Sequence, residues 1–333
     1  MRQSLFFLLL VVVAACTAPP PKINGVSFVA SGQPIAAVNV APLVKLNANY
    51  AALMPFGFMR AVDDPYLVFN SERQWFGERK EGVQQYIDEL RKQDIEVMLK
   101  PQLWISNGAY TGHLEMATEA EWRQFEMHYR EFILTFARQA TKAKVPIFCI
   151  GTELERFIAH RPDFWFELIA EVRQIYPGKL TYAANWDAYG RVPFWNDLDY
   201  IGVDAYFPVS DSILPTVAEA RVGWQKWKKE LKLVSEAFDR PILFTEYGYR
   251  SGDFAGKEPW DSKRDGRPVN LAAQANLLTA LYEEFWAEPW MAGGFLWKWF
   301  VAHEAVGGER HTLFTPQNKP AQQVVQRFYS KIQ

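Results

Sequence analysis

Two glutamates, each at the end of a short apolar run, are the residues of this sequence best suited to chemistry. Glu153 ends the run that begins at Ile147, and Glu246 ends the run that begins at Ile242. A buried carboxylate is costly unless it is paired or hydrogen-bonded, so a strand that ends in one is unusual. Either glutamate alone could be the partner of an arginine. Two of them in one repeating pattern can act as a proton donor and a nucleophile or base, which is what cleavage of a glycosidic bond requires.

The elements that must position these acids follow from eight short apolar runs that alternate with amphipathic segments. The runs are bounded by Gly, Pro, Asn or Asp and are rich in β-branched and aromatic residues, as buried parallel strands are. They predict strands over residues 25–30, 53–59, 95–104, 146–154, 179–186, 200–207, 241–249 and 293–300. Apolar residues spaced three and four apart predict helices over residues 80–93, 119–142, 163–176, 214–238, 270–287 and 320–332.

Eight strand-then-helix units predict an α/β fold, a single (β/α)8 TIM barrel over residues 24–333. A doubly wound sheet is the alternative, but no Gly-rich phosphate-binding motif follows any early strand, which removes the usual nucleotide site of that fold. Active sites of such barrels lie at the C-terminal ends of the strands. The long polar segments 60–77, 105–118 and 251–268 follow predicted strands, as that rule requires.

Alternation of side chains along a strand predicts which residues point into the barrel. Glu153 is in phase with Ile147 and Cys149, and Glu246 is in phase with Ile242 and Phe244. The same reasoning, extended to neighbours of the predicted strand ends, gives ten candidate substrate contacts: Arg60, Lys100, Gln102, Trp104, Asn185, Trp186, Asp204, Tyr206, Trp297 and Trp299.

Several of these candidates have a second interpretation. A buried Lys or Arg must be paired, so Lys100 and Arg60 could neutralise Asp204 or a glutamate instead of contacting a sugar. Tyr206 could hydrogen-bond the nucleophile and favour its charged form. Trp297 could be a sugar platform or part of the core.

Composition narrows the classes of partner. The chain has 333 residues, 13 of them Trp, and a formal net charge of −2, which gives no electrostatic case for nucleic acid or for an anionic membrane surface. The five His are scattered, and Cys149 is the one cysteine of the predicted barrel, inside an apolar run. We therefore expect no metal site and no cofactor, and an inert buried thiol at Cys149.

The N-terminus has the order of a bacterial lipoprotein signal. An apolar stretch, too short to span a bilayer as a stop-transfer helix, leads to small residues and Cys16. This predicts a signal peptide over residues 1–15, a lipid on Cys16 and a tether over residues 16–23, with a simple secretory signal as the alternative. The expected location is the bacterial cell envelope, with membrane attachment by that lipid anchor. Thr17 is not the Asp that resembles an inner-membrane retention signal, which favours the outer membrane in a Gram-negative source.

Five motifs carry a family resemblance. They are Met54-Pro-Phe-Gly-Phe58, Leu99-Lys-Pro-Gln-Leu-Trp104, Ile150-Gly-Thr-Glu-Leu154, Asp204-Ala-Tyr-Phe-Pro208 and Phe244-Thr-Glu-Tyr-Gly-Tyr249. With them the chain resembles glycoside hydrolase family 113, in the clan of retaining (β/α)8 glycosidases. The resemblance implies a β-1,4-mannanase-like enzyme with an oligo- or polysaccharide substrate, no cofactor and no protein partner. In it Glu153 is the acid/base and Glu246 the nucleophile.

One departure from the wider clan concerns the sugar. Many clan members have Asn directly before the acid/base, where its amide contacts the sugar 2-hydroxyl, and this chain has Thr152. A hydroxyl reaches less far than an amide, so that contact could come from Asn185 or a loop. Two other functions therefore stay open. One is hydrolysis of another β-linked glycan such as glucan or xylan, and the other is a non-catalytic carbohydrate-binding envelope lipoprotein.

Overall fold

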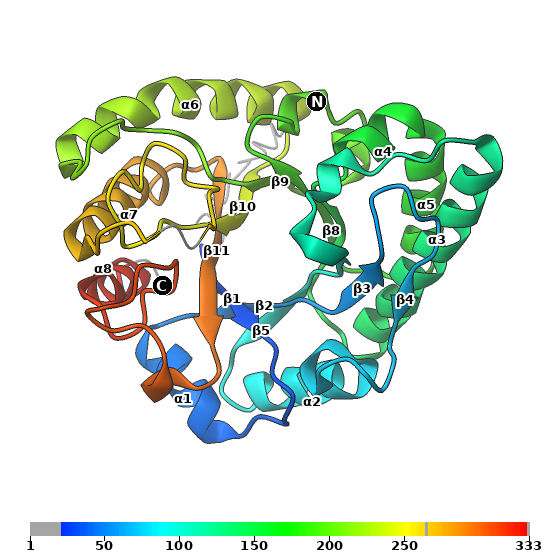
Figure 1. Cartoon of the computed structure of the whole chain (residues 1–333), viewed down its shortest axis with the longest axis horizontal. Helices are drawn as coiled ribbons and strands as arrows, with labels where there is room; N and C mark the ends of the chain where they lie inside the picture. The colour runs from blue at the N-terminus through cyan, green and yellow to red at the C-terminus, as the bar shows by residue number, and fades with distance from the viewer. Residues whose placement is uncertain (1–20, 264–265, 332–333) are drawn as a thin grey trace, which may run out of the picture.

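The computed structural model describes residues 21–263 and 266–331 and shows a (β/α)8 barrel ringed by helices (Figure 1). Eight parallel strands close in the order β1 (Ile23–Val29), β11 (Met291–Phe300), β10 (Ile242–Tyr247), β9 (Ile201–Asp204), β8 (Lys179–Asn185), β7 (Ile147–Thr152), β5 (Glu96–Leu99) and β2 (Tyr50–Leu53). Closure of the sheet confirms the predicted barrel and excludes the open doubly wound alternative.

The helices cover the outside of this barrel (Figure 1). They are α1 (Ala37–Lys45), α2 (Lys80–Arg91), α3 (Glu119–Lys142), α4 (Glu155–His160), α5 (Pro162–Ile175), α6 (Val217–Phe238), α7 (Leu271–Phe285) and α8 (Pro320–Tyr329). Short 3-10 turns lie at Phe76–Glu78, Ser106–Gly108, Thr111–His113, Tyr189–Arg191, Trp195–Asp197 and His303–Ala305. The predicted helix over residues 119–142 is confirmed at both ends. Thr118 and Glu121 form a capping box that satisfies donors at its first turn.

The core has two parts, separated by the sheet. A small cluster fills the barrel interior and takes side chains from seven of the eight strands: Ile23, Ala52, Met98, Ile147, Cys149, Ala183, Leu243 and Phe295. A much larger cluster lies between the strands and the helices, and it contains fully buried indoles such as Trp165, Trp224 and Trp286. Much of the high aromatic content therefore packs helices onto the sheet.

The predicted second and third strands were too long. Each is broken by a proline, Pro55 and Pro101, into a barrel strand and a second strand that leaves the barrel. The outer pieces, β3 (Phe56–Met59) and β6 (Gln102–Ile105), pair in parallel and form a small sheet with β4 (Val68–Phe69). A proline cannot donate to the ladder, so it ends one stretch of pairing and permits the change of direction.

Register shifts overturn the predicted phase of two strands. On β10, Ile242 and Phe244 face the helices, and Leu243 fills the barrel interior. The pairing with β9 then shifts between Phe244 and Glu246, and this bulge turns Glu246 toward the barrel mouth. A simple period of two cannot anticipate such an extra residue.

The strand β11 has a similar irregularity. Its pairing with β1 shifts between Leu296 and Trp299. Phe295 faces the interior as predicted, but Trp299 is fully buried on the helix side, stacked on His303. The prediction that Trp299 shares the inward face of the strand was therefore wrong, because the bulge reverses the alternation beyond Trp297.

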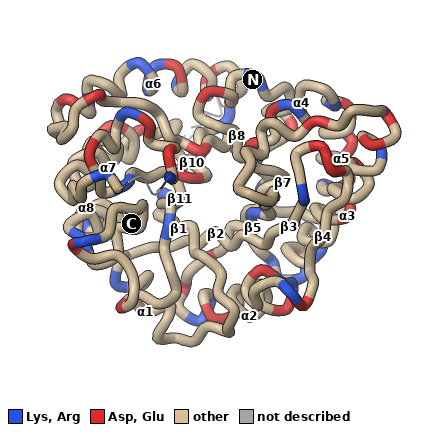
Figure 2. Tube along the Cα trace, viewed as in Figure 1, with Lys and Arg blue, Asp and Glu red and all other residues tan. Residues whose placement is uncertain are grey.

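Acidic and basic residues are interspersed around the outer helices (Figure 2). No helix within residues 21–263 and 266–331 is long and apolar enough to cross a membrane. The predicted signal peptide, Cys16 and most of the tether lie outside the described residues.

Candidate active site

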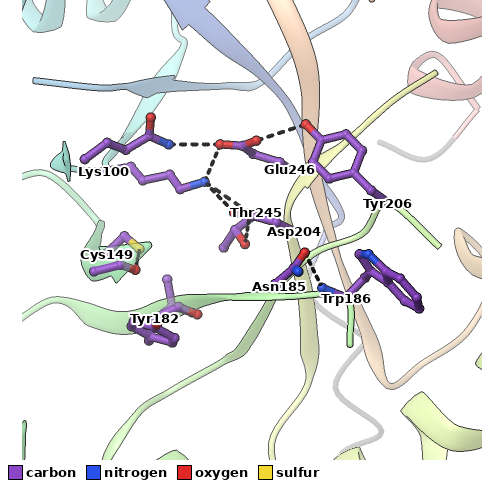
Figure 3. Close-up of polar contacts among 12 residues, drawn as sticks. Lys100, Cys149, Tyr182, Asn185, Trp186, Asp204, Tyr206, Thr245 and Glu246 are labelled. Carbon is purple, nitrogen blue, oxygen red and sulfur yellow. Dashed lines mark hydrogen bonds and ion pairs between the residues drawn. The ribbon is translucent and has the colours of Figure 1, made fainter. Parts of the chain in front are cut away.

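Glu246, at the mouth end of β10, is held by three hydrogen-bond donors from two segments of the chain (Figure 3). Lys100 Nζ lies 2.6 Å and Gln102 Nε2 2.9 Å from Oε1, and the Tyr206 hydroxyl donates to Oε2 at 2.9 Å. The carboxylate is 7% exposed. Because all three partners donate, they engage both carboxylate oxygens and fix the orientation of the side chain.

Lys100 is fully buried between two carboxylates. Its Nζ lies 3.1 Å from Asp204 Oδ1 as well as against Glu246, and Thr245 Oγ1 donates to the same Asp204 oxygen at 2.7 Å. Burial lowers the pKa of Lys100, but the charges of Asp204 and Glu246 raise it by more, so the lysine stays cationic. Burial and the Glu246 charge raise the pKa of Asp204 to about 7, against the opposing effect of Lys100. The structure thus confirms that Lys100 neutralises Asp204 and a glutamate.

Glu153 follows the last residue of β7 and reaches the mouth through an unusual backbone. The pairing of β7 with β8 shifts between Cys149 and Thr152, and Glu153 itself has φ of 51°, in the left-handed region. Two bonds hold this conformation: Glu153 N–H donates to Ala183 O at 2.8 Å, and Leu154 N–H donates to the Tyr182 hydroxyl at 2.6 Å. A left-handed glutamate is costly and is typical of functional sites.

The environment of Glu153 favours its neutral form. Burial raises the pKa of this carboxyl well above its usual value, and the nearby charges of Asp204 and Glu246 raise it further, while Lys100 opposes them. No side-chain hydrogen bond or ion pair to Glu153 is present among the described residues. The mouth therefore combines one carboxyl group oriented by three donors with one whose raised pKa favours its acid form, which is the division of roles that acid catalysis needs.

Thr152 and Asn185 are the two residues considered above in connection with the sugar 2-hydroxyl. Thr152 Oγ1 is buried and has no hydrogen-bond partner within the described chain. Asn185, at the end of β8, donates from Nδ2 to Asp187 and accepts from the Trp186 N–H. The structure thus places Asn185 next to Asp204 in register, with its amide engaged in its own loop.

A cavity of about 670 Å³ opens beside the barrel mouth, at the ends of β1, β2 and β11. Its wall includes Trp104 and Trp297, two of the residues predicted from the sequence as substrate contacts. Trp104 is 51% exposed and lies edge-on to Phe56, and it belongs to the same strand as Gln102, the donor to Glu246. The wall of the cavity is mostly apolar, with several aromatic side chains, and includes polar groups such as Gln74 and Glu78, features that suit a sugar chain.

Two predicted contacts are not part of the wall of this cavity. Arg60 follows β3 in the small outer sheet, is exposed and forms no ion pair within the described residues, so the prediction that it neutralises a buried acid was wrong. It was placed at a barrel strand end only because the break at Pro55 was not foreseen. Trp299, buried behind β11, does not reach the cavity.

Sequence reasoning missed three further residues that the structure adds. Thr245 fixes Asp204, Tyr182 fixes the backbone after Glu153, and Trp260 stacks on Trp186. Thr245 and Tyr182 lie on predicted strands, but neither was assigned to the inward face of its strand. Trp260 lies in a long loop, where no period assigns a direction.

The chain is similar to known glycoside hydrolases in both sequence and structure. Residues 31–315 match the profile of Glycoside Hydrolase Family 113. The chain belongs to this family. It is therefore a glycoside hydrolase, and the resemblance found in its five motifs is confirmed. No curated protein sequence matches this family 113 chain.

Solved structures agree with the family at the level of the fold. A GH113 β-mannanase from Alicyclobacillus acidocaldarius is 25% identical, with a TM-score of 0.82 over 94% of this chain and 99% of that one. A GH113 β-1,4-mannanase is 22% identical, with a TM-score of 0.80 over 94% and 100%. A β-glucuronidase from Faecalibacterium prausnitzii is 16% identical, with a TM-score of 0.60 over 95% of this family 113 chain and 50% of its own.

Proposed function

We propose that this family 113 chain is a retaining β-glycoside hydrolase whose substrate is β-1,4-mannan or manno-oligosaccharides. The observation that carries the proposal is the opposite treatment of two carboxyls at one barrel mouth. Glu246 receives three donors, whereas Glu153 receives none from the side chains that the structure describes and has a raised pKa. The substrate class is supported by the two family 113 neighbours described as β-mannanases.

In the proposed first step, a Glu246 oxygen attacks the anomeric carbon as the bond to the leaving oxygen breaks. Glu153 gives its proton to that oxygen, and a glycosyl ester forms on Glu246. Oε2 is the better placed attacking atom, because it accepts one hydrogen bond and Oε1 accepts two, one of them from an ammonium. In the second step Glu153, now ionised, takes a proton from water as that water attacks the anomeric carbon. The bond from that carbon to the Glu246 oxygen breaks, which releases the sugar and restores the Glu246 carboxylate.

Proton NMR of the first released sugar tests the reaction and the substrate together. Mature protein would be incubated with mannan, glucomannan, xylan and mixed-linkage glucan. We expect fastest release from the mannose-containing glycans, with the β-anomer appearing first. First appearance of the α-anomer would contradict a retaining mechanism. Faster cleavage of xylan or glucan would contradict mannan as the substrate. No release from any glycan would favour the non-catalytic alternative.

Replacement of Glu153 by Gln should remove the alkaline limb of the pH–rate profile. The acid must be protonated in the first step, so kcat/KM of the wild type should fall as pH rises through the raised pKa of Glu153. The amide introduced by Glu153→Gln cannot titrate, so the variant should be slower by about 10²–10⁴-fold on glycans and flat over that range. An aryl glycoside with an acidic phenol leaving group, which needs little protonation, should lose much less. A variant that keeps the alkaline limb would assign that limb to another group, with Asp204 as the next candidate.

The N-terminal sequence supports the further proposal that a lipid on Cys16 holds the enzyme at the bacterial envelope. A single acyl chain binds membranes only marginally, whereas a multiply acylated cysteine anchors stably. Membrane fractionation of the full chain and of Cys16→Ser measures this. We expect the wild type in the membrane fraction and the variant in the soluble fraction, and equal distribution would contradict the anchor.

A further inference from the structure

We propose that Trp260 and Trp186 form a second sugar platform, on the side of the barrel mouth that receives the leaving part of the glycan. This inference rests on the proposed glycosidase function and adds a binding site to it. Trp186 follows β8, and Trp260 lies in the loop between β10 and α7. The site is separate from the 670 Å³ cavity, whose wall contains neither residue.

The two indoles form a rigid stack. Their ring centroids lie 5.1 Å apart with an interplanar angle of 16°. Trp186 is packed edge-on by Phe207 and Trp227, and Trp227 Nε1 donates to Pro208 O at 2.9 Å. Trp186 therefore supports one face of Trp260. Trp260 is nonetheless 43% exposed, so much of its side chain is accessible, and a flat apolar ring can pack against the C–H face of a pyranose.

The loop that carries Trp260 is held in place at both ends. Gly252 pairs with Val269, and Asn270 Nδ2 donates to Asp253 at 2.8 Å. Next to Trp260, Asp261 accepts a bond from Arg267 at 2.6 Å. A platform that is already ordered loses little freedom when a ligand binds, so even one stacked sugar can contribute usefully to binding.

The topology places this stack across the mouth from the cavity. In the closed order of eight strands, β8 lies four positions from β1 in either direction, so the two strands are opposite each other. The cavity lies at the end of β1, and the stack lies at the end of β8. The two glutamates follow or end strands between these positions, β7 and β10. A glycan that contacts both sites must therefore cross the catalytic pair.

The acid decides which part of the glycan meets the stack. Glu153 follows β7, the neighbour of β8, and it protonates the oxygen that departs with the leaving sugars. The sugars attached to that oxygen therefore lie toward β8 and the stack. A substrate with a sugar leaving group can use Trp260, whereas an aryl glycoside places its whole sugar part on the opposite side.

The test compares two substrates on variants of the full mature enzyme. One substrate is mannohexaose and the other is an aryl β-mannotrioside. Trp260→Ala should lower the ratio of their kcat/KM values, mannohexaose over aryl glycoside, by about tenfold, which corresponds to about 1.4 kcal/mol of transition-state binding. Trp260→Phe keeps an aromatic face and should retain most of the ratio. Phe166→Ala, which removes a comparably exposed aromatic side chain from α5, should leave the ratio as in the wild type.

The two substrates also separate failure of the platform from failure of the proposed function. An equal loss on both substrates in Trp260→Ala would overturn the platform and assign Trp260 to loop packing. If the wild type cleaves neither substrate, the mannosidase proposal fails, and quenching of tryptophan fluorescence by manno-, cello- and xylo-oligosaccharides then tests the platform alone. Identical titrations for the wild type and Trp260→Ala with all three would overturn it.

Discussion

Replacement of Glu246 by Gln is expected to lower kcat by about 10⁴-fold or more, the scale of loss seen when a covalent nucleophile is removed. The amide keeps the shape of the side chain but cannot form a glycosyl ester. The fold should persist, because Lys100 keeps its ion pair with Asp204 in this variant. Initial rates on mannohexaose, with the melting temperature as a measure of folding, provide the measurement.

A smaller side chain at the same position permits a stricter test of the role. In Glu246→Ala, added azide can occupy the vacated space and attack the anomeric carbon from the same side as the lost carboxylate. We expect recovery of turnover on an aryl β-mannoside, with a glycosyl azide of α configuration as the product. Glu131→Gln on the exposed surface of α3 is the matched control and should behave as the wild type. A Glu246→Gln enzyme with near-normal turnover would remove Glu246 from the mechanism.

Replacement of Lys100 by Met is expected to cause the largest loss of stability of any change considered. Lys100 is fully buried and is the shared cation of Asp204 and Glu246, so its removal leaves two buried carboxylates close together without compensation. Breaking a buried ion pair from one side costs about 3–5 kcal/mol. Denaturant unfolding should show this loss, and activity should fall as well, because Glu246 loses its shortest hydrogen bond.

The pH dependence and a second substitution make the cause of this loss identifiable. Asp204 already has a pKa raised to about 7, and without Lys100 it should be raised further. A carboxyl whose folded pKa exceeds its unfolded pKa stabilises the fold as pH falls, so Lys100→Met should regain stability toward acidic pH. Lys100→Met combined with Asp204→Asn should also recover part of the loss at neutral pH, since one of the two charges is gone.

The controls for Lys100 follow from the same argument. Lys229→Met, at an exposed position of α6, should unfold with the wild type. If Lys100→Met were as stable as the wild type at pH 7, or if Asp204→Asn made the double variant worse, the ion-pair explanation would be wrong.

The barrel itself could be predicted from the sequence because it depends on features that repeat. Apolar runs and amphipathic segments alternate along the whole chain, and each has the length of a buried strand or a surface helix. The helix over residues 119–142 was predicted to the residue from the spacing of its apolar residues, and the structure adds a capping box of Thr118 and Glu121 at its start. Single-residue irregularities were not predicted. Pro55 and Pro101 divide strands that periodicity joined, and a bulge in β11 turns Trp299 away from the mouth.

Glu246 was predicted to lie at the barrel mouth, and it does, but the phase argument that placed it there was wrong. Glu246 lies at the mouth, although the residues taken as its partners in phase, Ile242 and Phe244, face the helices. The bulge before Glu246 corrects the phase at the point where the acid is needed. The identity of an acid at a strand end was therefore a more reliable signal than its position in an alternating pattern.

Residue types along the chain determined the eight-fold pattern and the two acids at its strand ends. Burial and secondary-structure propensity act on residues close in sequence, so they produce periodic patterns that can be recognised in the sequence. Only the tertiary structure decided how those acids differ. Lys100 and Gln102 come from one segment and Tyr206 from another, and they meet at Glu246. No residue that the structure describes donates a side-chain hydrogen bond to Glu153. The same holds for Trp260, whose loop carries no period and whose role depends on Trp186, 74 positions earlier in the chain. The protonation state of Glu153 and the geometry of the Trp186–Trp260 stack depend on distances between residues that are remote in sequence, and only folding sets those distances.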